Sequence, residues 1–207
     1  MKHKLMAQQL FTTSAYLGYL EEFDTQPILE AIYKLKEKSA GRVVSNAGGW
    51  QSKDYDAKTG WDIPECEDLF LNYITPMVEN ILEETGMYGV PMNKINYWYN
   101  VNPPGSYNEV HWHPYAYLSG TFYLKVPEDA KAGGSIVFQR PESEVDRLAW
   151  MTDYNKDIKY DHPEYNQSHW FYPKEKGIIL FPAHANHKVN LNTSNEERIS
   201  MAFNYSY

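Results

Sequence analysis

The chain has 207 residues, a length at which one domain with a sizeable core is the usual arrangement. Hydrophobic residues make up 43% of it and charged residues 22%, as in globular proteins, and the formal net charge of −8 argues against general binding to nucleic acid or anionic membrane. No apolar run could span a bilayer, no apolar signal segment follows residues 1–5, and the single Cys66 excludes an intramolecular disulfide. We therefore expect a cytoplasmic protein with no nucleic-acid or membrane partner.

The first part of the chain predicts two helices. Asp24 is suited to cap a helix whose apolar residues recur on one face. A second helix is expected to begin near Pro64 and to end at Gly86, with Pro76 as a point where it can bend. Between them, residues 45–52 are rich in glycine and predict a loop or a short strand.

From about residue 90 the chain is rich in β-branched and aromatic residues, which predicts strands separated by short turns. The expected strands are residues 93–101, 117–126, 135–140, 177–181, 187–191 and 198–205. Helices followed by strands indicate an α+β fold, mainly β, with the N-terminal helices packed on one sheet of a sandwich.

One connection, residues 141–173, is unusually long, polar and aromatic. Long connections in compact domains are often binding loops, so we expect this one to border the entrance for the substrate. The aromatic residues on which this interpretation depends are Trp150, Tyr154, Tyr160 and Trp170. Extra short strands or an oligomer contact explain the segment equally well.

The most informative pattern is His111-Trp112-His113. Alternate residues of a strand share a face, so the two imidazoles can hold one metal ion from one side. His187 begins a later expected strand and is the third candidate ligand, with His184, in the turn before it, as the second choice. Three imidazoles on one face of an iron ion leave the other face open for substrates and oxygen.

The last expected strand carries Arg198 and Ser200 on one face beside small residues. An arginine in such a place indicates space for an anion, because its planar guanidinium binds a carboxylate through two parallel hydrogen bonds. A buried structural ion pair is the alternative interpretation.

From about residue 95 onward, the chain resembles the iron(II)- and 2-oxoglutarate-dependent oxygenases, close to the small members of that superfamily found in bacteria and phages. The resembling stretches occur in the order expected for the family. They are residues 102–114, 118–127, 133–138, 181–187 and 198–204.

The resemblance implies a double-stranded β-helix, or jelly roll, formed by residues 1–207 as one domain, with the metal inside one mouth. It implies iron(II) bound by His111, His113 and His187. It also implies 2-oxoglutarate bound through Arg198, with Tyr123 and Ser200 as hydrogen-bond donors. The activity that it implies is a hydroxylase that uses 2-oxoglutarate, O2 and an unidentified primary substrate.

One residue departs from the family pattern, since His113 stands where most members have Asp or Glu. A three-His site has one negative charge less and resembles the iron sites of some thiol dioxygenases, which use no 2-oxoglutarate. Glu109 shares the strand face of the two histidines and is a candidate base or carboxylate ligand. Two alternatives therefore stay open: a cofactor-independent three-His iron dioxygenase, and a non-enzymatic jelly-roll module that binds a metal or ligand. An open metal position favours catalysis, and a closed four-ligand site favours the module.

Overall fold

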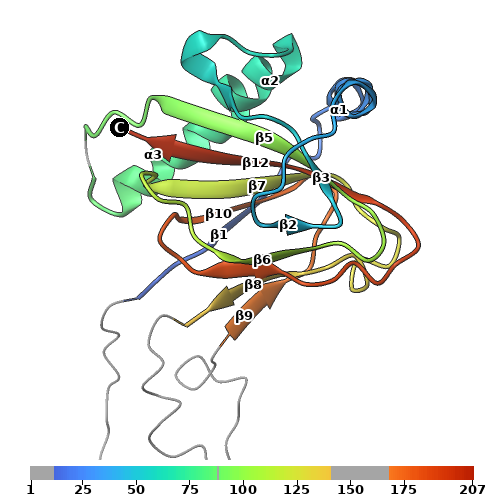
Figure 1. Cartoon of the computed structure of the whole chain (residues 1–207). Coiled ribbons are helices and arrows are strands. Elements are labelled where there is room, and N and C mark those ends of the chain that lie inside the picture. Colours follow the sequence, from blue (N-terminus) through green and yellow to red (C-terminus); the bar gives the residue numbers. More distant parts are fainter. Residues whose placement is uncertain (1–11, 88, 141–167) are drawn as a thin grey trace, which may run out of the picture.

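The structure is a computed structural model that describes residues 12–87, 89–140 and 168–207, and its strands form two antiparallel sheets (Figure 1). The larger sheet contains β1 (Tyr16–Tyr19), β3 (Trp50–Gln51), β4 (Tyr55–Asp56), β5 (Lys94–Asn102), β7 (Leu118–Lys125), β10 (Gly177–Pro182) and β12 (Arg198–Ser206). The smaller sheet contains β2 (Asn46–Ala47), β6 (Tyr107–His111), β8 (Ile136–Gln139), β9 (Ser168–Phe171) and β11 (His187–Val189).

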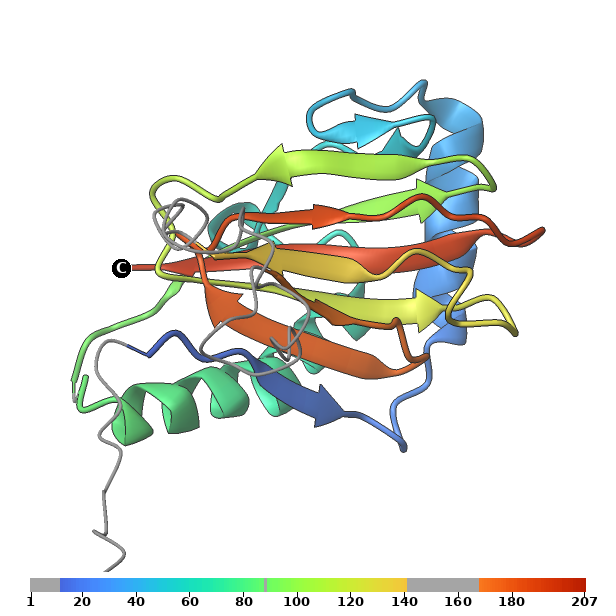
Figure 2. The same ribbon diagram turned by 90° about the horizontal axis from the view of Figure 1, so that it is seen from below.

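The order of the strands identifies the architecture. The larger sheet runs β1-β10-β7-β12-β5-β3, with β4 also paired to β5, and the smaller sheet runs β2-β6-β11-β8-β9. From β5 to β12 the chain alternates between the two sheets, except at the neighbours β8 and β9. Figure 2 shows the smaller sheet in front of the larger one, with α1 (Gln26–Lys38) running across the strands. This arrangement is the double-stranded β-helix that the family resemblance implies.

The predicted helices are present, with local differences. Asp24 accepts a hydrogen bond from the backbone N–H of Gln26 at 3.0 Å, but the N-cap residue of α1 is Thr25. The second helix consists of α2 (Pro64–Asp68), a π-helical segment (Leu69–Ile74) and α3 (Thr75–Glu84). Pro76 has no N–H to donate, and the wider helical turns come directly before it. Gly86, with φ of 77°, follows the end of α3, as expected.

The helices cover the outer face of the larger sheet (Figure 1), and strand β5 shows why the other face is free to form a site. Tyr97, Tyr99 and Val101 are fully buried in the core shared with the helices. The hydroxyl groups of the two tyrosines donate to the carboxylate of Asp62, at 2.6 and 2.7 Å. Because side chains alternate along a strand, the even-numbered residues of β5 face the smaller sheet.

All six predicted strands are present, with ends shifted by at most a few residues. Strand β6 was expected only as the strand around His111 and is not one of these six. Strand β1, which pairs with β10, was not predicted. Strand β9, which pairs with β8, agrees with the alternative that residues 141–173 carry extra short strands. Residues 45–52 contain the short strands β2 and β3. Within the described ranges, every helix is too short or too polar to cross a membrane.

Candidate metal centre

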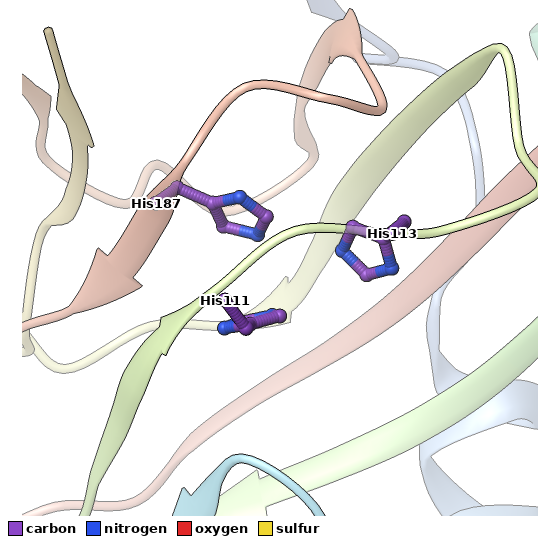
Figure 3. Close-up of side chains that lie close together, drawn as sticks. All are labelled: His111, His113 and His187. Atoms are coloured by element: carbon purple, nitrogen blue, oxygen red, sulfur yellow. The ribbon is translucent and has the colours of Figure 1, made fainter. Parts of the chain in front are cut away.

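Three histidines converge between the two sheets, and Figure 3 shows their rings turned toward a common space. One ligand nitrogen from each of His111, His113 and His187 lies within 4.8 Å of the other two. The ring centroids are 4.3 Å apart for the pair 111–187 and 5.2 Å apart for each of the other two pairs. Metal–nitrogen bonds are about 2 Å long, so small side-chain rotations are enough for all three to reach one ion.

Strand pairing brings two of these residues together. His111 is the last residue of β6, His187 is the first of β11, and the two are direct partners in the register of the antiparallel pair. His113 lies two residues beyond the end of β6, so the expectation that one strand carries both His111 and His113 is wrong. The backbone N–H of His113 bonds to the carbonyl of Ala183 at 2.9 Å, and this contact fixes the segment against the end of β10.

Backbone carbonyls orient two of the rings. Nδ1 of His111 lies 2.7 Å from the carbonyl oxygen of Glu109, and Nδ1 of His187 lies 2.9 Å from that of Ala185. A carbonyl only accepts, so each Nδ1 carries the proton and each Nε2 keeps its lone pair. This is how proteins commonly orient a metal-binding imidazole.

Burial keeps the three imidazoles neutral at physiological pH. It lowers the pKa of His113 to about 3, with the charges that His187 and His111 would carry as a further cause. Burial and the neighbouring His111 lower the pKa of His187 to about 4, and burial lowers the pKa of His111. Neutral nitrogens are the form that binds a cation.

Other candidates from the sequence lie elsewhere. Glu109 is exposed and meets His111 through its carbonyl rather than its carboxylate, and His184 is exposed in the turn after β10. Neither belongs to the histidine cluster. Trp150, Tyr154 and Tyr160 lie outside the described residues, whereas Trp170 lies in β9 and is half exposed.

The histidine cluster lies at the wall of a cavity of about 540 Å³ between the two sheets. Tyr123, Arg198 and Ser200, the residues expected to bind 2-oxoglutarate, line the same cavity. Ser200 is the register partner of Tyr123 on β7, so β7 and β12 carry the three side chains together. A cavity of this size is typical of sites for small molecules.

Arg198 is a buried cation that has no buried anion beside it among the described residues. Its side chain is 2% exposed, and Nη1 donates to the carbonyl oxygens of Gly133 and Gly134 at 3.0 and 2.7 Å. Nε is buried and has no hydrogen-bond partner, and no carboxylate of the described residues forms an ion pair with this arginine. The alternative of a structural ion pair is therefore absent from the described part of the chain. Burial disfavours the charged guanidinium and therefore lowers the pKa of Arg198. An anion bound in the cavity would offset this unfavourable free energy of burial.

Two residues that the sequence analysis did not single out share this end of the cavity. Asn100 and Asn102, on the inner face of β5, are buried and line the cavity. The sequence contains one signal for them: polar residues stand at alternate positions of β5, and the residues between them are mainly aromatic or apolar. Only the register shows that these two positions lie beside Ser200 and Arg198.

Comparison with known families gives one match: residues 96–204 match the family described as "Putative 2OG-Fe(II) oxygenase". The match runs from the start of β5 almost to the end of β12 and includes all three histidines. Comparison with curated protein sequences gives no match.

Solved structures with the same fold include the following three. A prolyl-4-hydroxylase from Pseudomonas putida has a TM-score of 0.62 and 13% identity, over 94% of this chain and 93% of that one. The 2-oxoglutarate-dependent epimerase SnoN of nogalamycin biosynthesis has a TM-score of 0.61 and 13% identity, over 94% and 76% of the two chains. HygX from Streptomyces hygroscopicus, solved with nickel and 2-oxoglutarate, has a TM-score of 0.58 and 11% identity, over 94% and 83%. At these identities the likeness concerns the fold.

Proposed function

The chain belongs to the 2OG-Fe(II) oxygenase family and is therefore an oxidoreductase that uses iron(II) and 2-oxoglutarate, and we propose that His111, His113 and His187 are its iron ligands. The observation that supports this assignment is the convergence of three neutral imidazoles, two partly buried and one buried, beside a buried arginine that has no counter-ion among the described residues. Three nitrogen ligands on one side of the ion leave its remaining positions for exogenous ligands.

The distal carboxylate of 2-oxoglutarate is assigned to Arg198. Because Nη1 is occupied by the two glycine carbonyls, the edge formed by Nε and Nη2 is the one left for a carboxylate. Tyr123 and Ser200 stand on the neighbouring strand positions and offer hydroxyl donors from the same wall. Arg198 and the histidine cluster thus hold the two ends of one short diacid.

The residues present fit the iron and cosubstrate that the family requires. When bound, iron(II) and 2-oxoglutarate supply the activation of O2, with 2-oxoglutarate converted to succinate and CO2 while the second oxygen atom enters a C–H bond of the substrate. The protein holds the ligand imidazoles in place: Phe138 and Phe181 pack on His187, with ring centroids 5.8 and 4.8 Å away. Apolar side chains at this point also limit the access of water to the metal.

The primary substrate is proposed to be a small molecule or an exposed group of a larger one that is hydroxylated in the remaining cavity. Trp98, whose ring centroid lies 5.6 Å from that of His113, extends the cavity wall beyond the metal ligands. A cofactor-independent dioxygenase and a non-enzymatic module are not favoured, because the family uses 2-oxoglutarate. In a protein that bound no 2-oxoglutarate, the buried Arg198 would have no anion to bind.

An anaerobic titration tests the proposal. Protein loaded with iron(II) is titrated with 2-oxoglutarate, and the weak visible charge-transfer band of the chelate is followed. We expect a saturable band in the original protein and none in His187→Ala, and we expect succinate to form on admission of O2. Oxygen consumption that does not depend on 2-oxoglutarate, with no band, would contradict the proposal and favour the cofactor-independent alternative.

A further inference from the structure

Two carboxamides are buried on the inner face of β5 without full hydrogen bonding. Asn102 is 1% exposed, and neither its Oδ1 nor its Nδ2 has a partner. Asn100 is 8% exposed, and its Oδ1 has no partner. Burying a carboxamide is unfavourable unless its polar atoms are bonded, so an unpaired amide in a cavity wall indicates a ligand or a function.

The sheet register places Asn102 beside the proposed carboxylate site. Asn102 on β5 is the direct partner of Arg198 on β12, and Asn100 is the direct partner of Ser200. Ser200 in turn has Tyr123 as its partner on the opposite side, on β7. The guanidinium therefore stands between a hydroxyl-bearing strand and a carboxamide-bearing strand, and Arg198 Nε and the Asn102 amide are both unpaired there.

A structural role for the Asn102 side chain is the competing explanation. The backbone carbonyl of Asn102 accepts a hydrogen bond from the side chain of Asn192 at 3.0 Å, so the backbone is anchored without help from the carboxamide. The carboxamide lies close to the backbone of the loop before β3, because a Cβ added to Gly49 would stand 2.8 Å from Asn102 Nδ2. Packing of this kind does not require an amide.

We propose that Asn102 is a cosubstrate-binding residue whose Nδ2 donates a hydrogen bond to the distal carboxylate of 2-oxoglutarate, next to Arg198. This inference rests on the proposed function, and it adds a third wall, β5, to the carboxylate site. One amide donor and the guanidinium edge then satisfy both oxygens of the carboxylate from adjacent strands. The amide contributes a hydrogen bond without a second positive charge.

The test compares two ligands that differ only at the distal end. 2-Oxopentanoate carries a methyl group where 2-oxoglutarate carries its distal carboxylate, so the ratio of their dissociation constants measures the contribution of that carboxylate. Manganese(II) replaces iron(II), and both ligands are titrated calorimetrically into the original protein and into Asn102→Asp and Asn102→Leu.

Asn102→Asp keeps the shape and replaces the donor by a like charge, so we expect 2-oxoglutarate to bind about tenfold or more weakly. Asn102→Leu removes the donor without repulsion, so its loss should be smaller. The affinity for 2-oxopentanoate should change by less than about twofold in both variants. That ligand has no distal charge to repel, and its remaining carboxylate is at the end expected to bind the metal, away from residue 102.

Asn93→Asp is the matched control. It adds the same charge at an exposed residue just before β5 that does not line the cavity, nine residues and about 30 Å away from Asn102, where solvent ions screen it. It should leave both affinities unchanged. Gly49→Ala provides an independent perturbation, because its new methyl group would stand 2.8 Å from Asn102 Nδ2 and 3.1 Å from the carbonyl oxygen of Val101. It displaces the Asn102 amide without altering its chemistry and should weaken the binding of 2-oxoglutarate more than that of 2-oxopentanoate.

The results distinguish an error in the role of Asn102 from an error in the proposed function. If Asn102→Asp lost affinity for both ligands equally, the pocket would have collapsed and the inference would be overturned. Unchanged binding in that variant, with Arg198→Lys impaired, would also overturn it while leaving the proposed function intact. If the original protein showed no preference for 2-oxoglutarate, the proposed function itself would fail. If Asn102→Asp did not fold, Asn102→Leu and Gly49→Ala would decide by the same ratio.

Discussion

Arg198 and Gly134 are fitted to each other: Nη1 of the arginine donates to the glycine carbonyl at 2.7 Å, and a Cβ on residue 134 would stand 2.8 Å from that same nitrogen. Gly134 has φ of 83°, and the added Cβ would also lie 2.5 Å from the carbonyl oxygen of Asn190. The glycine pair that precedes β8 therefore sets the direction of the guanidinium.

Gly134→Ala should lower the free energy of unfolding by about 2–4 kcal/mol and weaken 2-oxoglutarate binding, because the methyl group meets backbone and the guanidinium together. Gly105→Ala is a matched control, since Gly105 also has φ of 83° but no atom within 4 Å of its Cβ position. That control should lose only about 1 kcal/mol, the cost of the backbone conformation, and should bind the cosubstrate normally. Urea unfolding and calorimetry measure both quantities. Equal losses in the two variants would disprove a fit between residue 134 and Arg198.

Replacing any one of His111, His113 and His187 by Ala should weaken iron(II) binding by more than about tenfold while the fold is retained. The reason is that two remaining imidazoles hold the ion less well than three. Metal content after dialysis measures the effect, and circular dichroism checks the fold. His184→Ala, which removes an exposed histidine outside the cluster, should keep full metal content. Full occupancy in His187→Ala would reject this ligand set.

Arg198→Lys should weaken 2-oxoglutarate binding although the positive charge is kept. The ammonium group of lysine cannot donate to the two glycine carbonyls and to a carboxylate at the same time. It also lacks the planar edge that binds a carboxylate through two parallel hydrogen bonds. Losing such a pair at a buried anion costs roughly 2–5 kcal/mol, so the dissociation constant should rise by about 30-fold or more. The charge-transfer titration measures it. An unchanged constant would rule out Arg198 as the anchor.

Glu197 should contribute stability that depends on pH. Burial raises its pKa, but the hydrogen bond from Tyr33 and the charge of Lys125 outweigh burial and hold the pKa below the ordinary 4.5. A depressed carboxyl pKa gives stability that is present above the unfolded-state value and is lost as pH falls through the folded-state value. At pH 7, Glu197→Gln should therefore be less stable by about 1 kcal/mol.

Below the folded-state pKa of Glu197, the difference between the two proteins should disappear, as followed by urea unfolding between pH 7 and pH 3. Glu30→Gln serves as the control, because its pair with Lys34 is 70% exposed on both sides and should contribute nothing measurable. A constant difference across the whole pH range would show that packing, not ionisation, makes residue 197 stabilising.

The sequence predicts the strands from residue 90 onward because each has a strong run of β-branched and aromatic residues between turn residues. Strand β1 carries a weaker signal, since Leu17 and Tyr19 are exposed and Gly18 packs against Ile178 of β10. The pair with β10, a contact distant in sequence, is what makes β1 a strand. No local pattern reveals such a partner.

The sequence predicts which histidines come together, but it predicts only in part how the backbone positions them. Alternation along one strand suggested that His111 and His113 share a face, whereas His113 in fact lies past the strand end and is placed by its bond to Ala183. For Asn102 the sequence offers only its place among the polar residues at alternate positions of the strand, because its importance depends on a cross-strand partner 96 positions away. Register is a tertiary property, and residue types alone do not specify it.

The two faces of strand β5 have different roles: one face packs in the core with the helices, and the other lines the cavity. Tyr97, Tyr99 and Val101 belong to the core with the helices, whereas Asn96 and Trp98 face the cavity. Mutations at positions 96 and 98 can therefore accumulate without loosening the helices, so an ancestral protein of this kind could change its substrate through successive single substitutions in one strand. For protein engineering, a combinatorial library at these two positions, with the odd-numbered residues kept constant, should yield mostly folded variants with altered substrate preference.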